Sequence, residues 1–462
     1  MTKTIHSDIL KDKKHIHFIG IGGSGMFPLV QILHKMGYEI SGSDNNPGDT
    51  IDFERDVLGI PIVMEQKAEN IIGKDLIVHT AAIMADNPEL IAAKNSGIPT
   101  IERSILLGEV TRWFSDCIAV CGTHGKTTTT AMLAQILMES DMDPSAVIGG
   151  KLDSIGGSGR LGDTETMVCE ACEFKDTFLE MFPDIAVILN IDADHLDYFK
   201  TLDNIISSFR KFAQKTTKCL IVNGDDKNIQ KALENLELPK LITYGNSEKN
   251  NYYPKNIQHH DGGRCSYDLM HNGEKIDTVK LSIPGGHNVL NSIAAIVAAI
   301  EVGTNPEKAI LAADSFKGVH RRFEILGEIN GVTIADDYAH HPAEIEATLL
   351  AAKEMNFKNI WAVHQPFTYS RTSMLLDDFA KVLKIADKVV LSEIMGSREK
   401  NTYNIFAKDL SDKIDGCVWF KTFEEIANYV KKNAQAGDLV ITMGCGDVYK
   451  CAKMMLGEKS PK

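Results

Sequence analysis

The sequence has no apolar run near the roughly 20 residues that span a bilayer. Its first stretch, MTKTIHSDILKDKKH, contains no apolar core of the signal-peptide kind. Both absences favour a cytoplasmic protein with no membrane insertion. Basic residues are also in deficit, since 49 Lys and Arg face 63 Asp and Glu, for a net charge of -14. This balance argues against nucleic-acid partners, so an anionic ligand must be held by local donors.

A disulfide framework is absent as well. The nine cysteines are an odd number scattered along the chain, which fits a reduced compartment. Cys169 and Cys172 have the spacing of a metal-ligand pair. Because no second pair of this spacing accompanies them, the sequence gives little support for a zinc site.

What is present is an ordinary globular composition in a long chain. Hydrophobic residues make up 44% and charged residues 24% of the 462 positions. A chain of this length is too long for one hydrophobic core and suggests about two to four domains. Apolar strand patterns alternate with helical ones in three successive blocks, which predicts an α/β protein with mostly parallel sheets.

The segment VCGTHGKTTTTAML, residues 120–133, resembles a phosphate-binding P-loop with a shortened loop. Only Thr123 and His124 separate Gly122 from the Gly125-Lys126 pair. The apolar run before it predicts a buried strand, and the residues after it have helical spacing. We therefore expect backbone N–H groups to enclose phosphate, Lys126 to reach the β- and γ-phosphates, and the hydroxyl of Thr127 to ligate Mg²⁺. A plain glycine turn is the alternative, but a lysine is poorly placed beside a positive helix end.

A second glycine-rich loop occurs earlier, in residues 15–44. Gly20, Gly22 and Gly25 form a G-x-G-x-x-G pattern between a predicted strand and a predicted helix, and Asp44 follows the next strand. This is the dinucleotide-binding pattern in its usual context, with an acidic residue able to hold a ribose hydroxyl. Further strand candidates lie at 75–83 and 98–101, and the block is expected to end near Trp113.

Polar residues gather after a predicted buried strand, IAVILNI, in the second block. They are Asn190, Asp192, Asp194, His195 and Asp197. Because parallel sheets bind ligands at the carboxyl ends of their strands, a divalent cation is expected there. Helix capping is the alternative for Asp192 and Asp197.

A Gly-His-Asn loop precedes an alanine-rich helix in residues 281–300. Asn288 and Asn291 lie one turn apart, and their amides can both donate to and accept from a heterocycle such as adenine. A helix cap is the alternative for Asn288. Further on, Asn330-Gly331 predicts a hairpin turn. Later strands between helices predict a third α/β domain without a P-loop.

Six motifs, in this order, together resemble the Mur ligase family: GTHGKTTT, HLDYF, PGGHNVLN, KGVHRRFE, DDYAHHP and HQPFTYSRT. The shortened Gly-x-x-Gly-Lys-Thr loop is typical of that family. The resemblance implies an ATP-dependent amide ligase of peptidoglycan precursor synthesis, a monomer or homodimer with UDP-N-acetylmuramate and L-alanine as substrates. It also implies a UDP-sugar-binding Rossmann-like domain (1–113), a central ATPase domain (114–320) and a Rossmann-like C-terminal domain (321–462) that closes over the site.

The resemblance also implies roles for individual residues. ATP would be bound by Gly122, Thr123, Gly125, Lys126, Thr127, Thr128, Asn288, Asn291, Arg322 and Asp337. Mg²⁺ would be bound by Thr127, Glu173 and His195. The UDP-sugar would be bound by Gly20, Gly22, Gly23, Ser24, Gly25, Asp44, Thr80 and Ala81. Catalysis would fall to Lys126, Glu173, His195, Arg322, Tyr338, His340 and Arg371, with Arg371 holding the amino-acid carboxylate unless it is a surface residue.

Four positions depart from the family pattern. Cys172 and Lys175 replace acidic residues beside Glu173, while Phe367 replaces a histidine and Thr368 an arginine near the expected amino-acid pocket. A ligase that adds a preformed murein peptide therefore stays open as an alternative. An NAD-dependent oxidoreductase is a more distant one, because it has no need of the Gly-Lys-Thr loop.

Overall fold

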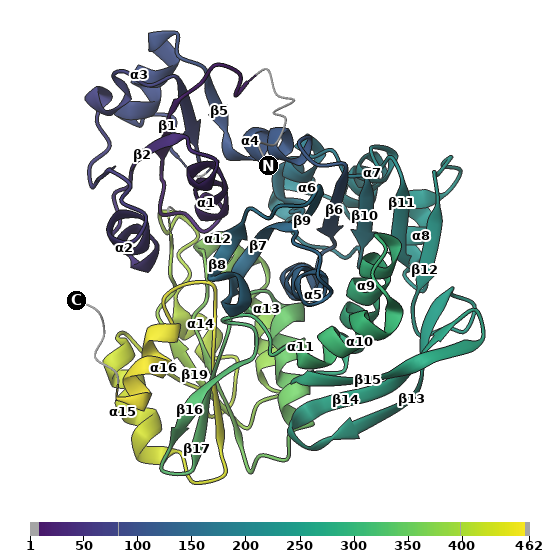
Figure 1. Cartoon of the computed structure of the whole chain (residues 1–462). Coiled ribbons are helices and arrows are strands. Elements are labelled where there is room, and N and C mark those ends of the chain that lie inside the picture. The colour runs from purple at the N-terminus through teal and green to yellow at the C-terminus, as the bar shows by residue number, and fades with distance from the viewer. Residues whose placement is uncertain (1–8, 82, 398, 458–462) are drawn as a thin grey trace. The chain divides into compact units, whose positions relative to one another are not determined.

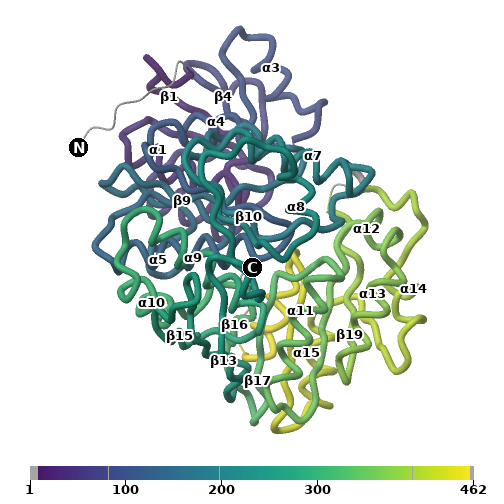
Figure 2. The backbone as a smooth tube through the Cα atoms, turned by 90° about the vertical axis from the view of Figure 1, so that its right-hand side faces the viewer, coloured from purple at the N-terminus to yellow at the C-terminus, as the bar shows by residue number. Residues whose placement is uncertain are grey.

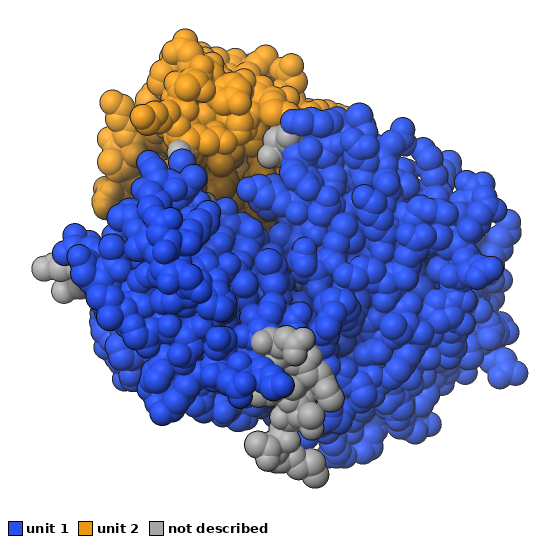
Figure 3. Space-filling model, turned by 90° about the horizontal axis from the view of Figure 1, so that it is seen from above, with its two compact units in different colours: residues 1–255, 268–279, 290–313 blue, residues 256–267, 280–289, 314–462 orange. Residues whose placement is uncertain are grey.

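The computed structural model describes residues 9–81, 83–397 and 399–457 (Figure 1). The predicted α/β class is confirmed, with three separate sheets. The chain divides into two compact units, coloured in Figure 3. Unit 1 comprises residues 1–255, 268–279 and 290–313, and unit 2 comprises residues 256–267, 280–289 and 314–462.

The first sheet, in unit 1, has five parallel strands in the order β3-β2-β1-β4-β5. The strands are β1 (His15–Ile19), β2 (Glu39–Ser43), β3 (Ile62–Val63), β4 (Leu76–His79) and β5 (Thr100–Glu102). The helices are α1 (Phe27–Lys35), α2 (Asp49–Asp56), η1 (Ala68–Ile71), α3 (Pro88–Ser96) and α4 (Arg103–Thr111). The strand order reverses between β1 and β4, which is the place where open α/β sheets bind ligands.

The second sheet has ten strands in the order β15-β14-β13-β12-β11-β10-β6-β9-β7-β8. Its central strands are parallel and mostly apolar, as expected when helices cover both faces. The strands are β6 (Asp116–Cys121), β7 (Ser145–Leu152), β8 (Gly157–Arg160), β9 (Thr166–Glu170), β10 (Ile185–Ile188), β11 (Cys219–Asn223), β12 (Leu241–Tyr244), β13 (Tyr252–His260), β14 (Arg264–His271) and β15 (Glu274–Pro284). The boundary between the two units runs through β13 to β15 and through α9 (His287–Glu301).

Helix α5 (Lys126–Glu139) follows β6 after a four-residue loop, 122–125, and most of its residues are buried. The other helices of this part are η2 (Asp153–Ile155), η3 (Phe174–Glu180), α6 (Leu196–Phe199), α7 (Leu202–Gln214), α8 (Lys227–Leu233), η4 (Asp261–Gly263) and α10 (Pro306–Ser315). No helix among the described residues is both long enough and apolar enough to cross a membrane.

Two helices of the first sheet pack tightly on the second sheet within unit 1. A Cβ on Gly108 of α4 would lie 2.2 Å from the carbonyl oxygen of Glu180, and one on Gly159 of β8 would lie 2.4 Å from the Cα of Pro28 in α1. The backbone N–H of Gly159 also donates to Gln31 Oε1, at 3.0 Å. Helix α1 contacts β7 and β8, and α4 contacts η3. Figure 2 shows both helices close to β1 and β4 of their own sheet.

The third sheet, in unit 2, has the order β16-β17-β21-β18-β19-β20. Its strands are β16 (Glu324–Ile329), β17 (Val332–Asp337), β18 (Ile360–His364), β19 (Lys388–Ser392), β20 (Val418–Phe420) and β21 (Leu439–Met443). Its helices are α11 (Pro342–Lys353), α12 (Tyr369–Met374), α13 (Leu376–Leu383), α14 (Ala407–Ser411), α15 (Phe423–Asn433) and α16 (Tyr449–Leu456). The predicted Asn330-Gly331 hairpin is confirmed, because β16 and β17 pair antiparallel and both turn residues have positive φ, 51° and 77°.

Candidate active site

The shortened P-loop joins β6 to α5 in unit 1, as the sequence predicts. Gly125 has a φ of 85° and precedes the first helical residue, Lys126. A Cβ at Gly125 would lie 2.6 Å from the Oδ1 atom of Asn291. Glycine is therefore required here both by the left-handed backbone and by the neighbouring amide. The same contact brings Asn291 to the loop that was expected to bind ATP.

Lys126 is the cationic centre of this loop. Its Nζ donates to the carbonyl oxygens of Gly122, at 2.5 Å, and of Thr123, at 3.0 Å, and pairs with Glu173 Oε2 at 3.0 Å. Burial alone would lower the pKa of Lys126, but the charges of Glu173, Cys172 and Glu170 and the hydrogen bond to Glu173 together outweigh burial, and the pKa is raised. Glu173 is 2% exposed, and burial raises the pKa of its carboxyl despite Lys126. The loop thus contains a buried lysine ammonium that is paired with the buried carboxylate of Glu173.

Asn190 clamps the P-loop, a role that the sequence did not reveal. Its Oδ1 accepts from the N–H of His124 at 2.8 Å, and its Nδ2 donates to the carbonyl oxygen of the same residue at 3.0 Å. Its own carbonyl accepts from the N–H of Thr123 at 3.1 Å. The first polar residue after β10 therefore fixes the loop instead of facing a ligand.

Two of the remaining polar residues after β10 accept hydrogen bonds from the backbone next to them. Asp192 Oδ1 accepts from the N–H of Ala193, and Asp194 Oδ1 accepts from the N–H of His195. His195 has a φ of 51°, and its ring lies 4.7 Å from that of Phe174. The side chain of Asp197 lies outside the described residues. The described residues contain no ready-made cluster of three or more His, Cys, Asp or Glu side chains for a metal ion.

The oxygen atoms near Lys126 nevertheless fit Mg²⁺, which prefers one or two carboxylates and keeps several waters. Glu173 Oε2 is buried and lies 3.0 Å from the ammonium of Lys126, so a carboxylate is already present beside the lysine. The hydroxyl of Thr127 donates to Glu170 Oε1 at 3.2 Å, which brings a second carboxylate to the loop.

The two cysteines with metal-ligand spacing do not act as a pair. The Sγ atom of Cys169 lies 3.8 Å from that of Cys117 in the strand core. Cys172 instead lies near Lys126, and burial raises the pKa of its thiol to about 11. The neighbouring departure, Lys175, is exposed with its ammonium over the ring of Phe174. Neither replacement removes Glu173 from the loop.

The glycine-rich loop of the first sheet also lies at the carboxyl ends of its strands. Gly20 to Gly25 follow β1, Thr80 and Ala81 follow β4, and Asp44 follows β2. The N–H of Gly22 donates to Asp44 Oδ2 at 3.0 Å, and the N–H of Asn46 donates to Oδ1 at 3.0 Å. Asp44 thus braces the loop, and its expected contact with a ribose stays a prediction, as do those of Gly23 and Ser24.

Behind this loop, α2 contains an unusual buried acid. Glu54 is fully buried, and neither carboxyl oxygen has a hydrogen-bond partner in the described parts of the chain. Burial, and secondarily the charge of Asp44, raise the pKa of Glu54 to about 8. Glu54 is therefore mostly protonated at neutral pH.

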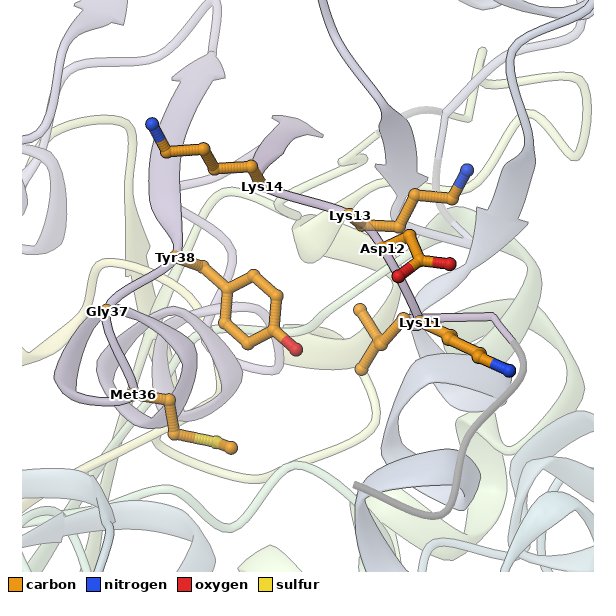
Figure 4. A pocket seen from close by; sticks show the side chains of 8 residues that line it. Lys11, Asp12, Lys13, Lys14, Met36, Gly37 and Tyr38 are labelled. Atoms are coloured by element: carbon orange, nitrogen blue, oxygen red, sulfur yellow. The ribbon is translucent and has the colours of Figure 1, made fainter. Parts of the chain in front are cut away.

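A cavity of about 350 Å³ lies at the opposite end of β1 (Figure 4). It is lined by Leu10, Lys11, Asp12, Lys13, Lys14, Met36, Gly37 and Tyr38. Its lysines direct their ammonium groups away from the ring of Tyr38 in the centre. The cavity also lies at the carboxyl end of α1, where the helix dipole disfavours anions. It is not a phosphate site.

Asn288 is not the cap of α9, because the helix already begins at His287. Its Nδ2 donates to the carbonyl oxygen of Pro284 at 2.6 Å. Asn288 is 6% and Asn291 8% exposed. Their expected contacts with ATP stay predictions.

In unit 2 the two arginines of the motif KGVHRRFE make different contacts. Arg321 Nε donates to Asp336 Oδ2 at 2.9 Å, and its Nη2 donates to the carbonyl oxygen of Gly444 at 2.6 Å. Arg321 is therefore a structural link, which the sequence analysis missed. Arg322 lies with its guanidinium 5.2 Å from the ring centre of Tyr338.

Asp337 ends β17 and holds the next loop in place. Its carboxylate accepts from the N–H groups of Phe323 and Ala339, both at 2.7 Å. Burial raises the pKa of Asp337 to about 6, although Arg322 opposes the rise. Its expected part in ATP binding is untested by this geometry.

The expected amino-acid residues Tyr338, His340 and Arg371 lie in the same unit. Burial lowers the pKa of His340, and the nearby cation of Arg371 contributes. Nη1 of Arg371 is buried and has no hydrogen-bond partner among the described residues. Thr368, at the position of the missing arginine, caps α12 by accepting from the N–H of Arg371. Phe367 pairs with Met395 in an isolated bridge.

Two glycine-rich loops at the carboxyl ends of parallel strands, one with a buried lysine and glutamate beside it, are typical of nucleotide-dependent enzymes. Three models match the chain: Mur ligase family, catalytic domain (residues 15–115), Mur ligase middle domain (120–299), and Mur ligase, glutamate ligase domain (321–446). The chain belongs to the Mur ligase family of ATP-dependent ligases.

Several relatives match along the whole chain. The UDP-N-acetylmuramate–L-alanine ligase of Acetivibrio thermocellus is 43% identical over 453 residues, 96% of each chain. That of Agathobacter rectalis is 45% identical over 449 residues, 96% of this chain and 97% of the relative. The solved UDP-N-acetylmuramate–alanine ligase of Thermotoga maritima has a TM-score of 0.83 at 28% identity and covers 96% of this chain and 98% of its own. A murein peptide ligase of Psychrobacter arcticus has a TM-score of 0.75 at 25% identity, with the same coverage of both chains.

Proposed function

We propose that this enzyme joins L-alanine to the carboxylate of UDP-N-acetylmuramate in peptidoglycan precursor synthesis, with conversion of ATP to ADP and phosphate. The observation that carries the proposal is the full-length similarity to ligases of that name. We place the reaction in the cytoplasm, where ATP and UDP-linked precursors are made. A monomer or homodimer stays the expected state.

The reaction has two steps in which atoms balance. A carboxylate oxygen of the muramyl group attacks the γ-phosphorus of ATP, and ADP leaves with the electrons of the broken P–O bond. The alanine amine then attacks the carbonyl of the acyl phosphate and loses a proton, and phosphate leaves with one oxygen of the original carboxylate. Both steps gather negative charge on phosphoryl oxygens, which fixed donors must stabilise.

Lys126 is placed to supply this stabilisation. Its ammonium lies at the first turn of α5, where the loop N–H groups and the helix dipole also favour phosphate. Glu173 holds the lysine by charge, since their atoms lie 3.0 Å apart in a buried setting. ATP phosphates would then replace the loop carbonyls as partners of the ammonium.

We assign Mg²⁺ to Thr127 and Glu173, with His195 nearby, because Thr127 supplies a hydroxyl oxygen and Glu173 a buried carboxylate beside Lys126. When bound, the ion would neutralise phosphate charge and polarise the phosphoryl group. The residues themselves orient the nucleotide, through the P-loop that Asn190 clamps.

We assign recognition of the amino-acid carboxylate to Arg371 in unit 2. Its buried Nη1 atom has no acceptor in the described residues, and a bound carboxylate supplies one. His340 lies in range of this cation and has a lowered pKa, so it is a neutral hydrogen-bonding group at pH 7.

The proposal is tested by phosphate release with UDP-N-acetylmuramate and, in turn, L-alanine, glycine, L-serine and a murein tripeptide. We expect L-alanine to give the highest kcat/KM. A higher value for the tripeptide would establish the peptide ligase instead. In parallel, ¹⁸O in the muramyl carboxylate should appear in the released phosphate. Its absence would exclude the acyl phosphate, and micromolar binding of NAD would favour an oxidoreductase.

A further inference from the structure

The topology of the third sheet marks a ligand-binding point at its carboxyl edge. Strands β18 and β21 are neighbours and run parallel. The chain leaves β18 toward α13, which shares a core with α11, and leaves β21 toward α16, which shares the core of the other face with α15. Figure 1 shows α15 and α16 on one side of this sheet and α11 and α13 on the other. Neighbouring strands whose next helices lie on opposite faces mark the usual binding point of an open α/β sheet.

Three polar side-chain atoms near this point are buried and have no hydrogen-bond partner among the described residues. They are Nε2 of His364, Oε1 of Gln365 and Nη1 of Arg371. His364 ends β18 and Gln365 follows it, whereas Arg371 lies in α12. His340 lies within electrostatic range of both His364 and Arg371, so the three residues share one neighbourhood. Buried polar groups without partners are costly, and a ligand from outside the chain would satisfy them.

The hydrogen bonds at the end of β21 determine that His364 is an acceptor. Its Nδ1 lies 3.0 Å from the carbonyl oxygen of Met443, which also accepts from the N–H of Gln365 at 3.0 Å. Because a carbonyl oxygen can only accept, Nδ1 carries the ring proton and Nε2 keeps a lone pair. Burial lowers the pKa of His364 to about 4, although the bond to Met443 opposes this, so the ring is neutral at pH 7.

Both acceptor side chains are held in place by packing. The ring of His364 stacks on that of Phe379, with 5.5 Å between their centres. Gln365 is 7% exposed. A Cβ on Gly446 would lie 2.4 Å from Oε1 of Gln365 and 2.5 Å from Sδ of Met395, so the glycine leaves room for the amide oxygen. The two lone-pair atoms therefore have fixed positions beside the loop that follows β21.

The chemistry of the three atoms limits the ligand that can satisfy them. Two acceptors repel the oxygens of a phosphate, whereas a guanidinium attracts an anionic group. The ligand must therefore carry N–H or O–H donors close to a carboxylate. A free α-amino acid has this combination, because its amine and its carboxylate are bonded to one carbon.

We propose that His364 Nε2 and Gln365 Oε1 accept hydrogen bonds from the amine of the incoming amino acid while Arg371 binds its carboxylate. The inference rests on the proposed function and adds the groups that orient the nucleophile. Bonds to its hydrogens fix the direction of the amine, and a fixed direction is a main requirement for attack on the acyl phosphate. His364 also supplies an imidazole to a motif in which Phe367 replaces one.

The test compares L-alanine with propionate, which keeps the carboxylate and the methyl group but has no amine. Steady-state phosphate release gives the KM for L-alanine and the inhibition constant of propionate as its competitor. We expect Gln365→Met and His364→Phe, which keep the volume of each side chain, to raise the KM for L-alanine by about 10- to 100-fold and to leave the constants for propionate and ATP within about threefold. Arg371→Ala should weaken both L-alanine and propionate.

A conservative variant and a matched control accompany these changes. In His364→Gln the amide oxygen reaches the place of Nε2, so its KM for L-alanine should fall between those of wild type and His364→Phe. Gln435→Met is the control, because Gln435 precedes β21 at the other edge of the sheet, where its Oε1 accepts from Lys358 at 2.8 Å. It should change none of the constants. Melting temperatures equal to that of the wild type show that a loss of affinity is not a loss of fold.

Two results would overturn the inference. If the inhibition constant of propionate rises as much as the KM for L-alanine, His364 and Gln365 shape the pocket or support Arg371 and do not bind the amine. If the KM for L-alanine is unchanged in both Gln365→Met and His364→Phe, neither residue contacts the amino acid. A wild-type enzyme that releases no phosphate with L-alanine would instead refute the proposed function.

Discussion

At the scale of single residues, Lys126 shows how a buried lysine keeps its positive charge. Its raised pKa means that the ammonium stays charged in a site that would otherwise favour the neutral amine. We expect Lys126→Ala to lower kcat by about a hundredfold or more, since a fixed electrostatic donor is lost. Steady-state phosphate release measures the change.

The matched control for this variant is Lys151→Ala, since Lys151 is exposed on β7. It should leave kcat unchanged. Circular dichroism should show both variants folded. A Lys126→Ala enzyme within threefold of wild type would refute the assignment of the P-loop.

Arg371 carries the prediction for amino-acid recognition. Because its buried Nη1 has no hydrogen-bond partner among the residues that the structure describes, a substrate carboxylate would gain a charge-assisted hydrogen bond worth about 1.5–3 kcal/mol. We therefore expect Arg371→Ala to raise the KM for alanine by roughly ten- to several-hundredfold and to leave that for ATP nearly unchanged. Kinetics with each substrate varied in turn measure both.

Arg371→Lys is the companion variant. It keeps the charge but loses the planar pair of donors, so its KM for alanine should fall between those of wild type and Arg371→Ala. If the KM for ATP or the UDP-sugar rises while that for alanine stays constant, the residue has been assigned to the wrong substrate.

At the scale of elements, the short P-loop depends on a strand that is not part of it. Asn190, after β10, holds both backbone groups of His124 by two hydrogen bonds of 2.8 and 3.0 Å. Asn190→Ala leaves these groups without their partner, at a cost of about 1–3 kcal/mol. We expect the KM for ATP to rise about 5- to 100-fold, with the KM for alanine nearly constant.

Asn204→Ala is a suitable control, because Asn204 Nδ2 also donates to a backbone carbonyl, that of Phe199, at 2.7 Å. It lies in α7, away from the loop, and should not alter the KM for ATP. An unchanged KM in Asn190→Ala would show that the loop keeps its shape without the clamp.

The sequence predicts those elements whose signal is local. The strand and helix around Lys126, and the hairpin at Asn330-Gly331, depend on apolar spacing and on turn chemistry within a few residues. Strands β13 and β15 were not predicted, because about half of their residues are exposed and most of these are polar, so their pattern resembles a loop.

The candidate site was predicted in kind but not in all its partners. Lys126 and Glu173 follow from motifs, and the structure pairs them. The clamp by Asn190 joins residues 66 positions apart along the chain, and the link from Arg321 to Asp336 joins residues 15 positions apart in different elements. No spacing rule reveals such contacts, since a polar side chain after a strand serves a ligand and a backbone amide equally well.

At the scale of the whole molecule, Glu54 makes stability depend on pH. Its pKa is raised from 4.5 to about 8 in the folded state, so between these values the unfolded chain releases a proton that the folded chain keeps. Stability contributed in this way is full below about pH 4.5 and is lost as pH rises to about 8. Glu54→Gln removes the titration, and we expect it to stabilise the protein by roughly 2–4 kcal/mol at pH 8 and little at pH 5.

Denaturant unfolding at both pH values measures the difference. Glu89 is the matched control, because it is equally buried but its oxygens bind His17 and Ser43, both at 2.6 Å. Glu89→Gln should destabilise the protein at both pH values. The test is the difference in unfolding free energy between Glu54→Gln and wild type at each pH. If this difference is the same at pH 5 and pH 8, Glu54 is not held protonated.

The close packing of α1 and α4 on the second sheet limits how this enzyme can be recombined with others. Backbone meets backbone at Gly108 and Gly159, where even a methyl group would collide with the carbonyl of Glu180 or with Pro28. A hybrid that takes its first domain from another ligase imports a foreign surface at both places. We expect a hybrid to be insoluble if its breakpoint is chosen from the order of domains along the chain alone. A transplant that carries β7, β8 and η3 together with residues 15–113 keeps both of these contacts.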